Sequence, residues 1–253
     1  MLSALRQRLA QGHRTIRFPH ALPALSDRYR GRPEIDQVRC AGAACDACAR
    51  ACPTGAIAAS EAGVALDLGR CLFCADCVEA CPERAIRFTA DWRMATRGRD
   101  DLVVGAGALH LAEALDARMR RLFGRALRLR QVSAGGCNAC EADTNVLNTI
   151  GFDLGRFGVQ FVASPRHADG VLITGPVTAN MELALQKTID AVPEPRLVIA
   201  VGACAISGGP YVGHPEARDG VPAGVRVDLF VPGCPPHPIT ILDGLLRLLG
   251  RIE

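Results

Sequence analysis

The chain has 253 residues, of which 49% are hydrophobic, and a formal net charge of +3. It is long enough for one large domain or two modest ones, and no run of about 18 apolar residues predicts a membrane span. Twelve cysteines, in a chain whose N-terminal segment is unlike a signal peptide, favour metal ligation over disulfides.

The first predicted element is an amphipathic segment at residues 2–9. Arg6 and Arg8 interrupt its apolar residues, so it lacks the long apolar core of a signal peptide. A basic amphipathic helix can instead lie on an anionic membrane surface. We expect at most a surface contact of this kind.

Two cysteine runs with the same ending follow. The first comprises Cys40, Cys45, Cys48 and Cys52, and the second comprises Cys71, Cys74, Cys77 and Cys81. Each ends in C-x2-C-x3-C followed by proline, the run with which two-cluster bacterial ferredoxins hold 4Fe–4S clusters. Three of the four cysteines recur at an offset of 29 residues, and short strands are predicted between the runs at 56–59 and 63–66. The pattern therefore predicts a duplicated, ferredoxin-like α+β domain with two clusters.

The spacing also assigns ligands to each cluster. Three cysteines within a short loop can hold three corners of a cubane, whereas the fourth, before proline, is carried toward the other cluster. Each proline removes an N–H and turns the chain at the fourth ligand. We therefore expect one cluster to be held by Cys40, Cys45, Cys48 and Cys81. We expect the other to be held by Cys71, Cys74, Cys77 and Cys52.

The first run departs from the usual spacing, because four residues separate Cys40 from Cys45 where two are usual. The C-x4-C-x2-C order also occurs in plant-type two-iron ferredoxins, but their fourth cysteine is not three residues further on. We interpret the insertion as a bulge of small residues, and the assignment of Cys40 depends on that interpretation. Structural zinc is the alternative for C-x2-C pairs, yet zinc needs no fourth cysteine before proline in two copies.

A basic segment joins the two halves of the chain. Residues 108–130 predict a helix with leucines mostly on one side and six arginines, within a linker at 96–130. Residues 1–130 hold 21 arginines and 14 acidic residues, whereas residues 131–253 hold 8 basic and 12 acidic ones. We expect no nucleic-acid partner, because anionic clusters offset part of the basic excess. The linker helix is interpreted as solvated or partner-facing, with contact to an anionic membrane as the alternative.

The second half alternates apolar runs of strand length with helical stretches. Strands are predicted at 159–163, 171–174, 197–202 and 227–231, and helices at 181–191 and 239–249. This alternation predicts a flavodoxin-like α/β domain, in which a parallel sheet carries helices on its faces.

Four further cysteines lie in this half. Cys204 and Cys234 each follow a predicted strand, and ligands of such sheets bind at the carboxyl ends of the strands. Cys137 and Cys140 open a predicted helix whose N–H groups can face an anionic cluster. We expect these four thiolates to hold a third 4Fe–4S cluster, and glycines beside them leave room for it. The alternative for Cys204 and Cys234 is that they are buried apolar residues.

Five ordered motifs in this half resemble one family closely. They are GGCNACE at 135–141, SPRHAD at 164–169, GPVT at 175–178, GACA at 202–205 with GG at 208–209, and PGCPP at 232–236. They resemble the small subunit of membrane-bound, energy-converting nickel–iron hydrogenases, as in formate hydrogenlyase, and its relative, the quinone-facing cluster subunit of complex I. Residues 17–90, with RGRP at 30–33 and LGRCLFC at 68–74, resemble the two-cluster ferredoxin-like subunit of the same complexes. The chain is thus similar to a fusion of two subunits, divided at 1–95, 96–130 and 131–253.

The resemblance implies an electron-transfer subunit that carries three 4Fe–4S clusters and makes and breaks no substrate bond itself. The partners that it implies are a hydrogenase-type large subunit and membrane-arm subunits, at the cytoplasmic side of the membrane. Complex I subunits have two adjacent cysteines at this position. In this chain two residues separate Cys137 from Cys140, which favours the hydrogenase branch. The alternatives are a complex I-like subunit that reduces quinone and a hydrogenase-like complex without nickel. Two alternatives from a different class of function also remain, a soluble ferredoxin-like carrier and a zinc-stabilised binding module.

The resemblance also singles out an acidic residue. Glu141 matches the family's carboxylate beside the third cluster, which implies proton transfer. The alternative is that Glu141 is an acid favoured by the positive end of the helix dipole. Asp143 stands where these hydrogenase subunits often carry Glu. We expect His167 to be structural and His237 to cap a helix or lie at the surface.

Overall fold

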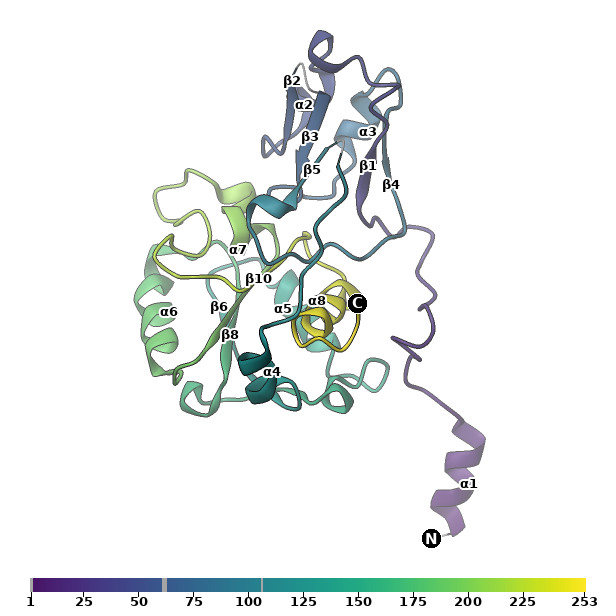
Figure 1. The fold of residues 1–253 in the computed structure, drawn as a ribbon, viewed down its shortest axis with the longest axis vertical. Helices are drawn as coiled ribbons and strands as arrows, with labels where there is room; N and C mark the ends of the chain where they lie inside the picture. Colours follow the sequence, from purple (N-terminus) through teal and green to yellow (C-terminus); the bar gives the residue numbers. More distant parts are fainter. Residues whose placement is uncertain (1, 61–62, 106) are drawn as a thin grey trace.

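The computed structural model describes residues 2–60, 63–105 and 107–253. A small domain stands on a larger α/β domain, and helix α1 (Leu2–Gln11) extends away from both (Figure 1). The elements of the small domain are β1 (Pro33–Ile35), η1 (Gly42–Ala44), α2 (Ala47–Ala51), β2 (Ile57–Ser60), β3 (Gly63–Asp67), α3 (Asp76–Ala80), β4 (Ile86–Phe88), η2 (Asp100–Leu102) and β5 (Val103–Val104).

The small domain is built as a duplication. Strand β1 pairs antiparallel with β4, and β3 pairs antiparallel with β2 and β5. Helices α2 and α3 lie 29 residues apart in sequence, like most of the cysteines, and pack against each other. The predicted repeat and both strands between the runs are confirmed.

The larger domain is a five-stranded parallel sheet with helices on both faces. Its strands lie in the order β10-β9-β8-β6-β7, and every neighbouring pair is parallel. Taken in chain order this is the 2-1-3-4-5 arrangement of flavodoxin-like folds, so the predicted fold class is confirmed. Its elements are β6 (Leu127–Ser133), α5 (Ala139–Val146), η3 (Leu154–Phe157), β7 (Val159–Phe161), η4 (Pro165–His167), β8 (Gly170–Thr174), α6 (Ala179–Ala191), β9 (Leu197–Val201), α7 (Ala203–Ser207), η5 (Gly209–Tyr211), β10 (Leu229–Val231) and α8 (Pro238–Leu248).

Strands β8 and β9 are buried on both faces, so side chains that alternate along them enter two different cores. Leu172 and Ile199 face the core beneath α8, whereas Ile173 and Val198 face the core beneath α6. Helix α8 is buried along its whole length, and α6 buries only Leu185 and Ile189. A sheet covered on both sides explains the continuous apolar runs that mark β8 and β9 in the sequence.

The predicted helix over 108–130 is wrong in most of its extent. Only α4 (Ala117–Phe123) is helical, with Asp116 accepting the N–H groups of Arg118 and Met119 at its N-terminus. Residues 127–133 form β6 instead, a central strand of the sheet. In β6, leucines alternate with arginines at a period of two, so Leu127 and Leu129 are buried while Arg128 is exposed.

The linker fastens the two domains together. Thr96 and Phe230 exchange backbone hydrogen bonds of 3.0 and 2.8 Å, which sets the linker beside β10. The guanidinium of Arg99 donates two hydrogen bonds, of 2.9 and 2.6 Å, to the carboxylate of Asp67 at the end of β3. Because one short segment contacts both domains, their relative position is fixed by specific bonds.

Helix α1 makes the least contact with the rest of the molecule. None of its residues is buried, and it lies beyond the end of the α/β domain that is farthest from the small domain (Figure 1). No helix within the described ranges is long and apolar enough to cross a membrane.

Candidate iron–sulfur sites

The structure gathers the eight cysteines of the small domain into two neighbouring groups. The thiol of Cys48 has a raised pKa, chiefly because burial desolvates its thiolate, and further because Cys40 and Cys81 lie nearby. Burial raises the pKa of Cys71 to about 12, and the nearby Cys77, Cys52 and Cys74 contribute. Cys45 is half-buried between η1 and α2, three residues before Cys48.

Cys81 lies near Cys48 and Cys52 lies near Cys71, as the predicted exchange requires, and the assignment of ligands to each cluster stays a prediction. The first cysteine set comprises Cys40, Cys45, Cys48 and Cys81, and the second comprises Cys71, Cys74, Cys77 and Cys52. In each set the cysteine before proline comes from the other repeat. Backbone N–H groups donate to the sulfur of both exchanged cysteines at 3.2 Å, from Ala56 to Cys52 and from Ala85 to Cys81.

The extra residues between Cys40 and Cys45 form a single turn of 3₁₀ helix, η1. Gly42 takes a φ of +57° there, a conformation that suits glycine. The insertion is thus a compact bulge, and Cys40 packs against the same core as Cys48.

The remaining four cysteines lie at the carboxyl edge of the parallel sheet and form the third cysteine set: Cys137, Cys140, Cys204 and Cys234. Cys137 and Cys140 follow β6, Cys204 follows β9 and Cys234 follows β10. The chain reverses direction across the sheet between β6 and β8, and ligands of open α/β sheets bind at this switch point. A distributed set of residues therefore converges where the topology favours binding.

Burial, together with repulsion from neighbouring thiols, raises the pKa values of Cys140, Cys204 and Cys234. Burial raises the pKa of Cys204 to about 12, with Cys234, Cys137 and Glu141 adding to the shift. Burial also raises the pKa of Cys140, and Cys204 is its strongest thiol neighbour. Positively charged iron restores the thiolate form that burial disfavours, so buried thiol groups of this kind fit a metal cluster.

Glycines keep the backbone clear around the third set. A Cβ at Gly202 would lie 2.5 Å from the sulfur of Cys140, and one at Gly209 would lie 3.0 Å from the sulfur of Cys204. Both residues also have positive φ angles, of +90° and +54°. A larger residue at either position would displace a cysteine of the set.

Within residues 2–60, 63–105 and 107–253, no three Cys, His, Asp or Glu side chains converge as ligands of one metal ion. What separates zinc from 4Fe–4S clusters is the cysteine pattern, since zinc needs no fourth cysteine before proline in two copies.

Glu141 lies in the first turn of α5, beside Cys140. It is only 6% exposed, and the hydroxyl of Thr174 donates a 2.5 Å hydrogen bond to its carboxylate. It also lines a cleft of about 720 Å³ with Ser133 and Asn145. Glu141 thus lies between Cys140 of the third set and this cleft. Asp143 is partly buried, and burial raises its pKa.

His237 is the N-cap of α8. Its Nδ1 accepts the N–H of Ile239 at 3.1 Å, so the predicted capping role is confirmed. Burial lowers its pKa. His167 ends the short turn η4, next to the start of β8.

The sequence did not predict two contacts that lie beside the cysteines. Arg30 donates 2.9 Å hydrogen bonds from Nη1 to the carbonyls of Phe73 and Cys74, in the loop of the second set. Tyr29 packs edge-on against His237, with ring centroids 5.2 Å apart. The RGRP motif marked this segment, but nothing in the sequence paired it with either loop.

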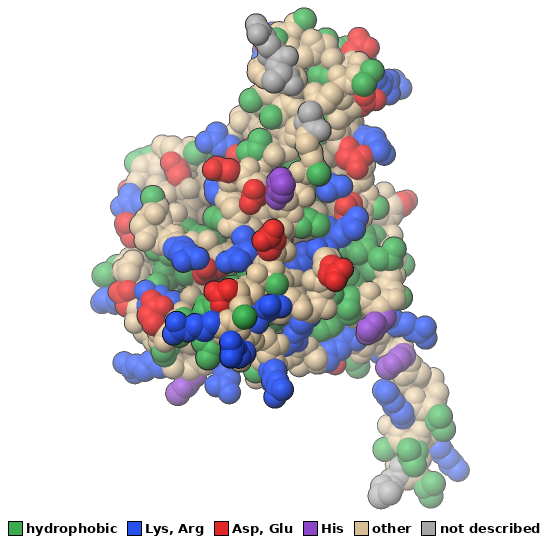
Figure 2. Space-filling view, viewed as in Figure 1, with side chains coloured by type: hydrophobic (Ala, Val, Ile, Leu, Met, Phe, Trp, Pro, Cys, Tyr) green, Lys and Arg blue, Asp and Glu red, His purple; other side chains and the backbone are tan. Residues whose placement is uncertain are grey.

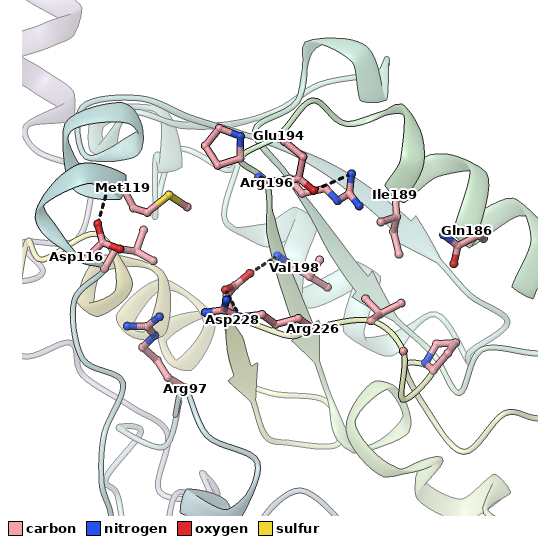
Figure 3. A pocket seen from close by; sticks show the side chains of 15 residues that line it. Arg97, Asp116, Met119, Gln186, Ile189, Glu194, Arg196, Val198, Arg226 and Asp228 are labelled. Atoms are coloured by element: carbon pink, nitrogen blue, oxygen red, sulfur yellow. Dashed lines mark hydrogen bonds and ion pairs between the residues drawn. The ribbon is translucent and has the colours of Figure 1, made fainter.

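A second cleft, of about 650 Å³, is lined by Val198 at the start of β9 and by Asp228 just before β10 (Figure 3). It therefore lies at the opposite end of the sheet from the third set. Its charged side chains come from three arginines and three acids: Arg97, Arg196, Arg226, Asp116, Glu194 and Asp228. Several pair with each other, as Arg196 does with Glu194 at 3.2 Å. Because the charges are balanced and no cysteine lines this cleft, it takes no part in the iron–sulfur sites.

Fold and cysteine sets define a class, an iron–sulfur protein that joins a two-cluster ferredoxin-like domain to a flavodoxin-like cluster domain. Residues 39–86 match the 4Fe-4S dicluster domain, and residues 137–248 match the NADH ubiquinone oxidoreductase, 20 Kd subunit. The chain belongs to the family of that 20 Kd subunit, and it is an iron–sulfur electron-transfer subunit of an oxidoreductase.

Three relatives match about half of the chain. A probable membrane-bound hydrogenase subunit, mbhJ, of Pyrococcus furiosus is 38% identical over 54% of this chain and 81% of its own length. An NADH-quinone oxidoreductase subunit of Heliobacterium modesticaldum is 39% identical over 47% of this chain and 69% of its own length. Formate hydrogenlyase subunit 7 of Escherichia coli is 37% identical over 55% of this chain and 54% of its own length. The predicted fusion is confirmed, because the dicluster match precedes the 20 Kd match in one chain.

Proposed function

We propose that this chain relays electrons through three 4Fe–4S clusters, as a subunit of a membrane-associated hydrogenase complex of the formate hydrogenlyase type. Residues 1–95 carry the first two cysteine sets, residues 131–253 carry the third, and residues 96–130 join them. When bound, the clusters supply one-electron transfer. The protein supplies their ligands, their spacing and the hydrogen bonds that tune their potentials.

The observation that carries the proposal is the continuous series of cysteines. Cys77 of the second set lies close enough to Cys48 of the first set for their charges to interact. Cys234 of the third set interacts in the same way with Cys74 of the second. Each cysteine set therefore has a neighbour, and the series leads from the small domain to the edge of the parallel sheet.

The exposed end of this series supports a partner subunit. Cys137 and Cys234 of the third set are exposed, although Cys140 and Cys204 are buried. The partner that we propose is a hydrogenase-type large subunit whose active site exchanges electrons with the third cluster. Two of the relatives described above are hydrogenase or formate hydrogenlyase subunits, and Cys137 and Cys140 are separated as in that branch.

The second candidate is a quinone-linked complex, or a hydrogenase-like complex without nickel. The relationship to an NADH-quinone oxidoreductase subunit favours it. Here the third cluster would pass electrons to quinone or to another acceptor. The two candidates share the electron relay and differ in the partner.

Glu141 is the residue that we propose for proton transfer beside the third cluster. Glu141 lines the cleft together with Ser133 and Asn145, and the hydroxyl of Thr174 donates a hydrogen bond to its carboxylate. A buried carboxylate that touches both the cluster environment and a cleft can accept a proton as an electron arrives. The helix-dipole alternative accounts for its position in the first turn but not for its bond to Thr174.

We propose further that the far end of the molecule attaches to membrane-arm subunits and to an anionic membrane, on the cytoplasmic side of that membrane. Leu2, Leu5 and Leu9 of α1 are 76%, 57% and 82% exposed. Figure 2 shows lysine and arginine side chains along the neighbouring end of the α/β domain, where α4 carries Arg118, Arg120 and Arg121. Exposed leucines beside basic residues suit the surface of an anionic bilayer.

The test is a metal analysis of the complex that co-purifies with this chain in the absence of oxygen. Stoichiometric nickel, with iron and sulfide, is expected. Iron and sulfide without nickel would overturn the hydrogenase assignment and favour the second candidate. A complex without iron or sulfide would overturn the electron relay itself.

A further inference from the structure

The gap between the second and third cysteine sets is spanned by residues that belong to neither set. Cys74 of the second set lies close enough to Cys234 of the third set for their charges to interact. On one side of this gap the hydroxyl of Ser207 donates a 2.8 Å hydrogen bond to the carbonyl of Gly69. Ser207 ends α7, the helix that begins beside Cys204, and Gly69 lies just before Cys71. One flank of the gap is therefore fastened by helix α7.

The other flank is spanned by the segment 29–31. The guanidinium of Arg30 holds two successive carbonyls, of Phe73 and Cys74, at 2.9 Å each. Phe73 and Ala75 have positive φ angles, of +56° and +79°, which are uncommon for residues other than glycine. Arg30 thus stabilises a strained loop on the side of the second set that faces the third.

Tyr29 makes the matching contacts with the α/β domain. Its ring packs edge-on against His237, and its hydroxyl lies 3.5 Å from the hydroxyl of Thr240. Thr240 is fully buried in the first turn of α8, and His237 follows Cys234 by three residues. Tyr29 is therefore anchored beside the loop of the third set.

Gly31, which follows these two residues, attaches the backbone of their segment to the small domain. Its N–H donates a 2.8 Å hydrogen bond to the carbonyl of Thr89, so the segment continues the pairing of β1 with β4. A Cβ at this position would lie 2.8 Å from the same carbonyl, which leaves room for glycine alone. Arg32 adds a 3.2 Å ion pair to Asp91. The backbone between the two anchors is thus tied to the small domain.

We propose that Tyr29 and Arg30 form a brace that fixes the distance and orientation between the second and third cysteine sets, and so sets the rate of electron transfer between the clusters. This inference rests on the proposed function, because it requires both clusters. Electron tunnelling slows steeply as the distance between redox centres grows. A side-chain brace that prevents the loops from separating is therefore a positioning device for the transfer step.

The test uses the full chain with its clusters, purified without oxygen, in the variants Arg30→Met and Tyr29→Ala. Arg28→Met is the matched control, because Arg28 is an exposed arginine two residues away. Iron and sulfide are counted first. The magnetic interaction between the reduced second and third clusters is then measured by electron paramagnetic resonance, and the transfer rate by flash reduction.

We expect both variants to retain their iron, to weaken the magnetic interaction and to slow the transfer at least tenfold, with the control unchanged. Unchanged coupling and rate in the two variants would overturn the brace while leaving the proposed function intact. If Arg30→Met loses the second cluster, Tyr29→Ala decides, since the Tyr29 contacts described above all lie in the α/β domain. A wild-type chain without iron would overturn the proposed function and the brace together.

Discussion

The two domains bring their cysteines together in opposite ways. In the small domain, eight cysteines lie within residues 40–81, and short helices and strands of three to five residues surround them. In the α/β domain, four cysteines are spread from Cys137 to Cys234 and meet only because three strands end at one edge. The first arrangement depends on local chain geometry, and the second depends on a complete fold. We therefore expect the small domain, whose core includes several of the cysteines, to depend on bound clusters for its stability, whereas the α/β domain has two apolar cores without that dependence.

The largest expected effect comes from removing the iron. We expect the small domain to unfold and the α/β domain to remain folded. The core of the small domain includes the cysteines themselves, and the binding energy of a structural metal can reach on the order of 10 kcal/mol. Amide hydrogen exchange before and after chelation measures this directly. If the amides of both domains stayed protected from exchange after chelation, the small domain would not depend on its iron in the way that we expect.

The next prediction concerns single cysteines. Cys204→Ala should remove about a third of the iron and sulfide and leave the first two clusters in place, since each cluster holds four irons. Cys77→Ala should lose more iron and sulfide than Cys204→Ala. The reason is that the first and second sets are expected to exchange their fourth cysteine, so the loss of one cluster disturbs the other. Iron and sulfide counts on the two purified variants test the contrast, and equal losses would argue that the domains bind iron as one unit.

A third prediction tests the independent stability of the α/β domain. Asp243 and Arg247 form a 2.8 Å ion pair on α8, with side chains only 3% and 9% exposed. Arg247→Met leaves a buried carboxylate without its partner and should cost about 3 kcal/mol. The double variant Asp243→Leu/Arg247→Met removes both charges and should regain most of the loss. Chemical denaturation that follows this domain measures both values, and a double variant no more stable than Arg247→Met would contradict the explanation.

The role of Glu141 is a prediction about turnover. Glu141→Gln keeps the shape of the side chain and removes its proton-accepting carboxylate, so we expect turnover of the complex to fall about 100-fold with cluster content unchanged. Glu182→Gln is the matched control, because Glu182 lies on the surface of α6 in a pair with Arg218. Normal turnover in Glu141→Gln would remove the residue from the mechanism.

The smallest expected effect is a pH dependence at the opposite end of the sheet. Burial raises the pKa of Asp228, which accepts the N–H of Val198 at 3.0 Å (Figure 3). A raised carboxyl pKa means that folding favours the protonated form, so stability is lost as the pH rises through the folded pKa. Asp228→Asn should therefore be more stable than wild type at pH 7, by less than about 1 kcal/mol, and equal to it at acidic pH. Denaturation midpoints at both pH values test the sign.

Short-range patterns in the sequence predicted the repeat and the strands before Cys204 and Cys234, and the structure contains both. The exchange of Cys52 and Cys81 between the clusters rests on the same kind of pattern and stays a prediction. Strand β6 was not predicted, because arginines and leucines in residues 108–130 fit a helical and a strand period at once, and only pairing with β7 and β8 decides between them. The contacts of Tyr29 and Arg30 could not be predicted from the sequence either, because these two residues contact loops that come together only when the two domains pack.

The exchanged cysteines also constrain the order of events during synthesis. The first cysteine set is incomplete until Cys81 has been made, so neither site of the small domain can be filled one repeat at a time. The third set is completed much later, because Cys234 is made 153 residues after Cys81. The two sites of the small domain are thus completed together, well before the third. A product truncated between Cys81 and Cys234 would carry a complete small domain without the third cysteine set.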